Sequence, residues 1–510
     1  MRLTKSDKIL IATLLIYHSI IFPFQLGNSL IADEGTHGLI SLFYRELFLK
    51  IPEFGFDFNS YFKLGLEYLV LYPKIQITYP PLFDIFTALV TYSLFGVSVL
   101  AGRVSSLIFS MGAFVMLYLL VKKHLGEKTA LISVLLFFSS FFVMFYVGKF
   151  LMDMTGYFFL FLSLYVFSEA VERKELKWFV LLGISVFLAA MSKRPAALIG
   201  VFILLYSIIL RIDKKYILTF LFISIILSAP YIFLLSKIGG FQINYLVVQT
   251  SGMMQGDPTL LSPMNWVYYF WHYLLIEPVG VIPLGFFLLY LYRKERLWKP
   301  ALLYFLVFYL GLSIAGNKEP RLFMYMFIPA IILFSEKLAK MKWWVIGSFL
   351  GVYLIFSAQS FVGSFENNPV KEVALYIYQN TPLNGNVGMV SESGYLYSSA
   401  LMFGTAELGR RDISFFRPCV FSDKSPEEIG ELIKRNNIYY VISVPTDSPE
   451  FLRNIQNFKS LQGFTLEKKI GEVEIYRVNN FEFREGVRCN YICLLKRWVC
   501  ENESIESLSL

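Results

Sequence analysis

The sequence predicts a polytopic α-helical membrane protein with about eleven transmembrane helices and a small C-terminal extracytoplasmic α/β domain. Three observations predict this fold class. First, the 510 residues are 56% hydrophobic and only 16% charged, whereas soluble domains carry roughly 25% charged residues. Second, apolar runs of roughly 18 residues, long enough to cross a ~30 Å hydrocarbon core, recur along the chain. Third, the composition turns abruptly to a mixture of polar and apolar residues after about residue 366.

Short basic connectors between the apolar runs set the orientation, because Lys and Arg concentrate in cytoplasmic loops. With these connectors inside, the N-terminus is cytoplasmic, the C-terminal domain is extracytoplasmic, and the cell (plasma) membrane is the expected location. The basic connectors are 122–128, 172–177, 211–215, 292–299 and 336–342. The predicted spans are 9–26, 102–121, 129–147, 151–170, 178–192, 195–210, 216–236, 277–291, 300–316, 321–335 and 343–361.

The apolar stretch 82–97 is not predicted to cross the membrane, because an additional span would move the basic connectors that follow it to the outer side. It is short and ends in Phe95-Gly96, so we interpret it as an interfacial helix within a large first outer loop, 28–101. The predicted domains are therefore a transmembrane domain at 1–361, an α/β domain at 366–480 and a tail of undetermined structure at 481–510.

The C-terminal region carries its own local signals. NVGMVSES, YYVISVP and EVEIYRV predict strands, and Ser425-Pro426-Glu427-Glu428 predicts a helix start. The four cysteines include no C-x2-C pair, so neither a zinc site nor an obligatory disulfide framework is expected.

The net charge of +8 is explained by the connectors and indicates no nucleic-acid partner. Ionisable groups near the membrane are costly and mark candidate functional sites. The first such group follows the first span, where Asp33 and Glu34 precede His37. These side chains suit acid–base chemistry, and a divalent cation held by His37 is an alternative use. A helix start that favours acids is the structural alternative.

Four further places on the same predicted face carry candidate residues. Asp153 begins a span and suits either a site or a helix cap. Two basic outer loops run against the positive-inside trend and suit a lipid phosphate, with ordinary headgroup binding as the alternative. They contain Lys193 with Arg194, and Glu319 with Arg321. Tyr79 precedes Pro80-Pro81 and is a candidate for lining a substrate.

These motifs together resemble the C-type polytopic glycosyltransferases that use a polyprenyl-phosphate or dolichyl-phosphate sugar donor. The similar branch is that of protein O-mannosyltransferases and aminoarabinose transferases. The resemblance covers roughly residues 1–360. Its carriers are ADEGTHGLIS at 32–41, TYPPLFDIF and the residues that follow at 78–110, FLMDMTGYFF and the residues that follow at 150–167, MSKRPAAL at 191–198 and NKEPRLFMYMFIPA at 317–330.

The resemblance implies roles for individual residues. Asp33 corresponds to the general base, and Glu34 assists it. Lys193 and Arg321 correspond to groups that neutralise the donor phosphate, and Arg103 matches an arginine of the returning helix that supports the same site. Arg194 stands where the family commonly has glycine, and we expect it beside the donor phosphate as well. Asp153, Tyr79 and Glu319 lie toward the acceptor or substrate. The implied reaction inverts the anomeric carbon, and its partners are the lipid-linked donor, membrane lipids and a protein, lipid or glycan acceptor.

A transporter or flippase of lipid-linked sugars is the main alternative function. A transporter would require charged residues near the middle of the membrane and an inverted repeat. The candidate residues instead gather at one predicted face, and no repeat is visible in the sequence. A scaffold that merely displays the C-terminal domain would not need the acidic pair.

Overall fold

The computed structural model describes residues 5–500 apart from 28, 73–78, 238–261, 277–281, 286, 288–297, 315–318, 364–367, 384, 393–397, 423, 480–481, 483–488 and 493–496. The chain divides into two compact units. The helical unit comprises Met1–Leu26, Thr78–Phe83 and Arg103–Phe365. The mixed unit comprises Gly27–Ile77, Asp84–Gly102 and Glu366–Leu510. Most of the first outer loop, except Thr78–Phe83, therefore belongs to the same compact unit as the C-terminal region.

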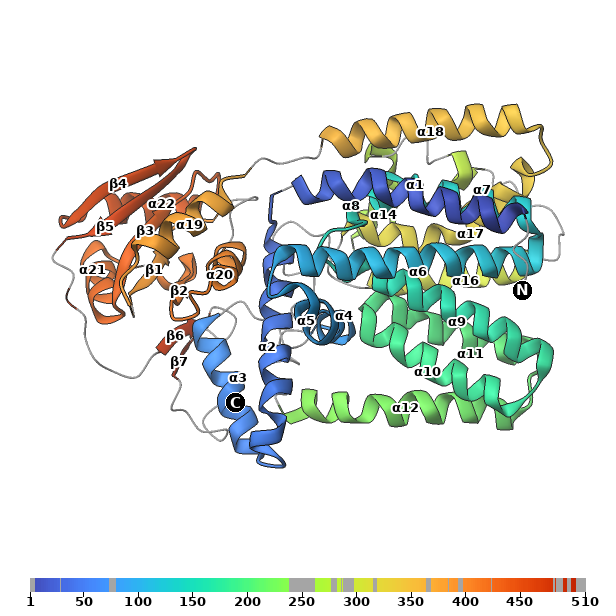
Figure 1. Cartoon of the computed structure of the whole chain (residues 1–510), viewed down its shortest axis with the longest axis horizontal. Helices are drawn as coiled ribbons and strands as arrows, with labels where there is room; N and C mark the ends of the chain where they lie inside the picture. The colour runs from blue at the N-terminus through green and yellow to red at the C-terminus, as the bar shows by residue number, and fades with distance from the viewer. Residues whose placement is uncertain are drawn as a thin grey trace. The chain divides into compact units, whose positions relative to one another are not determined.

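The helical unit is a bundle whose long helices run along one direction (Figure 1). Its described elements are α1 (Lys5–Gly27), α6 (Val99–Leu125), α7 (Glu127–Phe138), α8 (Phe141–Tyr146), α9 (Asp153–Arg173), α10 (Leu176–Ser192), η2 (Arg194–Ala197), α11 (Leu198–Ile209), α12 (Lys214–Lys237), α14 (Pro263–Ile276), α16 (Trp298–Ile314), η4 (Pro320–Leu322), α17 (Phe323–Leu338) and α18 (Trp343–Gly363).

Five helices among the described residues are long and apolar enough to cross a membrane. They are Asp7–Gly27, Val99–Leu125, Asp153–Arg173, Lys214–Ile232 and Trp343–Val362. Shorter apolar helices cover Leu82–Phe95, Leu176–Ser192, Arg194–Ile209 and Lys299–Ile314. The predicted helical membrane class is confirmed, whereas the count of about eleven spans and their orientation stay predictions. The predicted span 277–291 lies largely outside the described residues.

Two helices differ from the expected pattern. The predicted span 129–147 is two helices, α7 and α8, which are separated at Ser139 and Ser140. Ser140 makes no side-chain cap hydrogen bond at the start of α8, and its hydroxyl donates to Sδ of Met324 on α17. Mean hydropathy does not register such a contact between distant segments. The aromatic helix α14 was not predicted at all, since its 14 residues are fewer than a span requires.

The first outer loop is mostly helical, which was also not predicted outside the stretch 82–97. Helix α2 covers Ala32–Phe54 and α3 covers Phe58–Leu71. The prediction was made by searching for long apolar runs, and these helices carry too many charges to register in that search. The stretch 82–97 is helical as expected, with α4 (Leu82–Phe86), a π-helical turn (Thr87–Thr91) and α5 (Tyr92–Phe95) ending before Gly96 at φ +73°.

The C-terminal region of the mixed unit holds a five-stranded sheet in the order β2-β1-β3-β5-β4. Strand β1 pairs in parallel with β2 and β3, and β5 pairs antiparallel with β3 and β4. The strands are β1 (Asn386–Met389), β2 (Phe415–Phe416), β3 (Ile438–Ser443), β4 (Phe464–Ile470) and β5 (Val473–Val478). The remaining elements here are α19 (Val370–Asn380), α20 (Ser398–Glu407), η5 (Pro418–Val420), α21 (Pro426–Arg435) and α22 (Pro449–Lys459).

The predicted C-terminal elements are therefore confirmed. The three expected strands correspond to β1, β3 and β5. Helix α21 begins as its sequence indicated, because Ser425 accepts a hydrogen bond from the Glu428 backbone and the Glu428 carboxylate accepts one from the Ser425 N–H. This reciprocal pair satisfies two N–H groups that a helix start otherwise leaves without partners.

A disulfide joins Cys489 to Cys500, which corrects the expectation of no disulfide framework. Strands β6 (Cys489–Ile492) and β7 (Arg497–Cys500) pair antiparallel, with the two cysteines directly opposite each other. A spacing of eleven residues does not reveal such a hairpin when its strands are only four residues each.

Candidate functional site

The start of helix α2 separates the two predicted catalytic acids. Asp33 lies exposed in the first turn, where a negative charge is favoured by the helix dipole. Glu34 is fully buried, and its Oε2 accepts a hydrogen bond from the Ile31 N–H at 3.2 Å. Of the two carboxylates, Asp33 is therefore the one accessible to a substrate, while Glu34 holds the helix start.

One turn further along α2, His37 faces an acid that the sequence analysis did not single out. Its Nδ1 lies 3.1 Å and 3.2 Å from the two carboxylate oxygens of Asp84 on α4. Ser41, one more turn along, donates to Oδ1 of Asp84 at 3.1 Å. All three side chains are buried. Nδ1 of His37 and the carboxyl group of Asp84 thus form a buried hydrogen-bonded pair, and we refer to His37 and Asp84 as the dyad.

The pairing of His37 with Asp84 affects the predicted site for a divalent cation, because His37 was its expected ligand. Among the residues that the structure describes, no group of three or more His, Cys, Asp and Glu side chains is arranged to hold a metal ion. His37 directs Nδ1 toward Asp84 rather than presenting it to a cation. The described side chains around His37 therefore do not by themselves form the expected site.

Four predicted residues of the helical unit meet in one place, which we refer to as the ion cluster: Asp153, Lys193, Glu319 and Arg321. Lys193 Nζ donates to Oδ1 of Asp153 at the start of α9. Arg321 pairs with Glu319 through Nε, and its Nη1 lies 3.7 Å from Oδ2 of Asp153. Residues that are far apart in the sequence thus form a single charged network.

The electrostatics of the ion cluster are set by burial and by mutual pairing. Burial lowers the pKa of Lys193, and the Asp153 carboxylate opposes that effect. Burial raises the pKa of Glu319, but Arg321 and Lys193 outweigh it, so the pKa is below its ordinary value. Two cations and two carboxylates balance in formal charge.

A close approach of helices supports the ion cluster. A Cβ added at Gly156 of α9 would lie 2.3 Å from the Tyr325 hydroxyl and 3.1 Å from Cβ of Lys193. The Tyr325 ring stacks on Tyr157 with centroids 4.5 Å apart. Only glycine therefore permits this packing beside Lys193.

Arg103 takes a position that favours a structural role. It is buried, and its Nη1 donates to the backbone oxygens of Gln25 and Leu26 at the C-terminal end of α1. A cation there satisfies carbonyls that the helix leaves without partners. Tyr79 lies instead beside Arg194, with the guanidinium carbon 6.0 Å from the ring centroid.

The predicted site residues thus fall into two groups. Asp33, Glu34 and His37 lie in the mixed unit, and the others lie in the helical unit. Sequence reasoning missed Asp84, although it is the only charged residue in the apolar stretch 82–97 and such an isolated acid is a recognisable signal. It also missed Gly156 and Tyr325, whose importance follows only from the helix packing.

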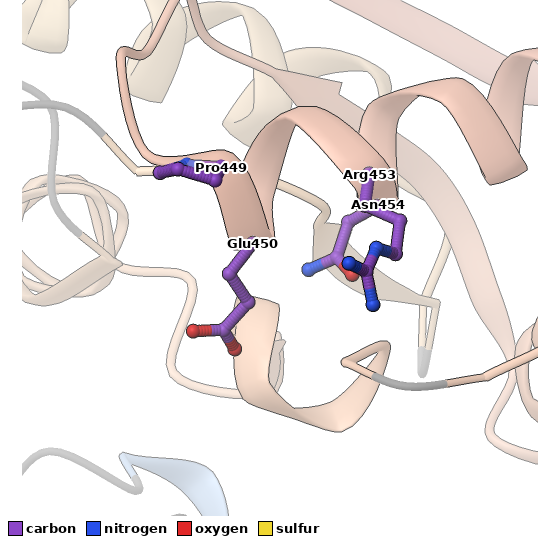
Figure 2. A pocket seen from close by; sticks show the side chains of 4 residues that line it. All are labelled: Pro449, Glu450, Arg453 and Asn454. Carbon is purple, nitrogen blue, oxygen red and sulfur yellow. The ribbon is translucent and has the colours of Figure 1, made fainter.

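A hollow at the start of α22 lies apart from all the predicted residues. Pro449, Glu450, Arg453 and Asn454 line it (Figure 2). Asn454 donates to the Pro418 carbonyl at 3.2 Å, and Ser422 donates to Glu450. These contacts tie α22 to the neighbouring turn and indicate a structural surface.

The fold is similar to that of several solved protein structures. The fold is similar to that of ArnT from Cupriavidus metallidurans bound to undecaprenyl phosphate, with 13% identity, a TM-score of 0.58, and coverage of 94% of this chain and 99% of that chain. It is also similar to the oligosaccharyltransferase AglB from Archaeoglobus fulgidus in complex with an inhibitory peptide and a dolichol-phosphate, with 12% identity, a TM-score of 0.52, and coverage of 86% and 69%. The Archaeoglobus fulgidus oligosaccharyltransferase in complex with Zn and sulfate gives 13% identity, a TM-score of 0.53, and coverage of 86% and 68%.

The chain therefore has a fold similar to that of these solved structures. Within it, residues 78–233 match the family described as dolichyl-phosphate-mannose-protein mannosyltransferase. No curated protein sequence matches the chain. The resemblance predicted from the sequence motifs is therefore confirmed in the fold and in the family match over residues 78–233.

Proposed function

We propose that this protein transfers a sugar from a polyprenyl-phosphate-linked donor to an acceptor at the outer face of the membrane. The observation that carries the proposal is the exposed carboxylate of Asp33 at the helix start, beside a buried Glu34 that holds its backbone. The ion cluster supports it, because Lys193 and Arg321 supply N–H donors suited to a phosphate. The lipid phosphates in the similar structures point to the same class of donor.

The proposed chemistry is a single displacement. The acceptor oxygen or nitrogen forms a bond to the anomeric carbon as the bond from that carbon to the phosphate oxygen breaks. The acceptor proton passes to Asp33 as general base, and the polyprenyl phosphate leaves with its charge stabilised by Lys193 and Arg321. Attack opposite the leaving phosphate inverts the anomeric carbon. Arg194, Tyr79 and Glu319 would contact the substrates around this centre, and Arg103 would position the end of α1.

The outer-face assignment has independent support. The disulfide between Cys489 and Cys500 suits an oxidising compartment, since cytosolic disulfides are rare. The basic connectors favour the same orientation. A donor already anchored in lipid would reach such a site without a soluble nucleotide sugar.

The test supplies radiolabelled dolichyl-phosphate mannose, and in parallel other polyprenyl-phosphate sugars, to membranes containing the protein. Wild-type protein should transfer label, and Asp33→Asn should lower the rate at least about 100-fold, the lower end of general-base effects. Asp57→Asn is the matched control, because Asp57 is an exposed carboxylate at the start of α3. Undiminished transfer by Asp33→Asn would overturn the catalytic assignment. Movement of intact donor across the membrane without transfer would favour the flippase.

A further inference from the structure

The acidic start of α2 is packed against helix α20 of the C-terminal region, and two glycines make this possible. A Cβ added at Gly35 would lie 2.5 Å from the Ser399 carbonyl oxygen, and one at Gly38 would lie 2.5 Å from the Phe403 ring. Real Cβ atoms essentially never approach other atoms this closely. The residues from Ser398 to Ala406 of α20 are all buried. The two helices are therefore in contact at the turn that carries Asp33 and Glu34.

Hydrogen bonds hold the backbone that leads into this turn. The Ser399 hydroxyl donates to the Ala32 carbonyl at 2.9 Å, directly before Asp33. Asn368 Nδ2 donates to the Leu30 carbonyl at 3.1 Å, and its backbone N–H donates to the Ser29 hydroxyl at 3.0 Å. The C-terminal region thus contacts the chain at several points within four residues of Asp33.

We infer that the C-terminal region is part of the reaction centre, and that Ser399, Phe403 and Asn368 are positioning residues for Asp33. The inference rests on the proposed function and assigns to this region a role in transfer itself. A general base acts only when held within about an ångström of its working position, and a misplacement of that size costs on the order of 100-fold in rate. The sequence separates Asp33 from these residues by more than three hundred positions, yet they belong to one compact unit.

The contact between Gly38 and Phe403 allows a decisive experiment. Gly38→Ala should slow sugar transfer at least about tenfold, because the added methyl displaces α2 from α20. Binding of undecaprenyl phosphate, used as the probe, should change less than about twofold, since Lys193 and Arg321 are unaltered. Removing the ring in the double variant Gly38→Ala/Phe403→Ala should restore transfer above the rate of Gly38→Ala alone. Gly430→Ala on α21 is the matched control, because its nearest neighbour would be 3.9 Å away.

The outcomes separate this inference from the proposed function. Wild-type protein that neither transfers sugar nor binds the probe contradicts the proposed function. Wild-type transfer with an undiminished rate in Gly38→Ala overturns only the positioning role, as does a double variant whose loss equals the product of the two single losses. If Gly38→Ala also loses probe binding, it is misfolded, and Ser399→Ala then decides. That variant should lower kcat with little change in KM for the donor, and an unchanged kcat overturns the inference.

Discussion

The Nδ1 atom of His37 lies 3.1 Å from Oδ1 of Asp84, and both side chains are buried. This relationship joins two segments of the first outer loop, one turn from the proposed general base. The pair is therefore placed to affect both the stability of the mixed unit and the position of α2.

The two members of the dyad should be strongly coupled. His37→Ala and Asp84→Ala should each destabilise the protein by about 1–3 kcal/mol, because each leaves a buried polar partner unsatisfied. The double variant should cost clearly less than the sum of both, since it leaves neither partner alone. Thermal unfolding in detergent measures all three. Additive losses would show that the two side chains do not interact.

Gly156 should be required for packing beside the ion cluster. Gly156→Ala places a methyl against the Tyr325 hydroxyl, for which no hydrogen-bond partner is found among the described residues. We expect a loss of about 1–3 kcal/mol, and Tyr325→Phe in the same chain should recover part of it. Tyr325→Phe alone should be neutral or slightly stabilising. The prediction is contradicted if the double variant is less stable than Gly156→Ala.

Arg321 should contribute to binding of the lipid phosphate. Arg321→Ala should weaken binding of undecaprenyl phosphate about tenfold or more, the range of one charge-assisted hydrogen bond of about 1.5–3 kcal/mol. Lys342→Ala removes an exposed cation from a predicted cytoplasmic connector and should leave binding unchanged. Equal affinities for both variants, measured by titration in detergent, would remove Arg321 from the phosphate site.

The disulfide offers a test of topology. In sealed vesicles with the outer face exposed, a membrane-impermeant thiol reagent should label Cys489 and Cys500 only after reduction. Cys489→Ser/Cys500→Ser should loosen the hairpin and destabilise the mixed unit by about 2–3 kcal/mol, as expected for a loop of this length. Protease cleavage near the hairpin should quicken accordingly. Labelling that requires lysis of the vesicles would place the tail on the cytoplasmic side.

Sequence reasoning succeeded where the determining interactions are local. The start of α21 at Ser425 and the strand β3 follow from neighbouring residues alone. The charges of Asp153, Lys193 and Arg321 were also visible in the sequence, because each interrupts an apolar pattern.

The remaining features depend on contacts between distant segments. Nothing near Gly38 in the sequence indicates Phe403, and nothing near His37 indicates Asp84. The exposure of Asp33 and the burial of Glu34 could not be predicted from the sequence, because adjacent acids at a helix start look equivalent there. A helix start at Asp33 and Glu34 was the structural alternative, but the full length of α2 was not predicted, because a charged helix does not register in a search for apolar runs.

The hairpin of β6 and β7 has a consequence for how the protein is made. Asn490, on β6, donates to the Val70 carbonyl at the end of α3 at 2.8 Å and to the Ser414 hydroxyl at 3.0 Å. The chain must therefore be synthesised at least as far as Asn490, and the hairpin must reach the same compartment as α3, before Val70 acquires this neighbour. Contacts of such long sequence separation form late in folding. A chain interrupted before the hairpin would therefore lack the hydrogen bond that the end of α3 receives from Asn490.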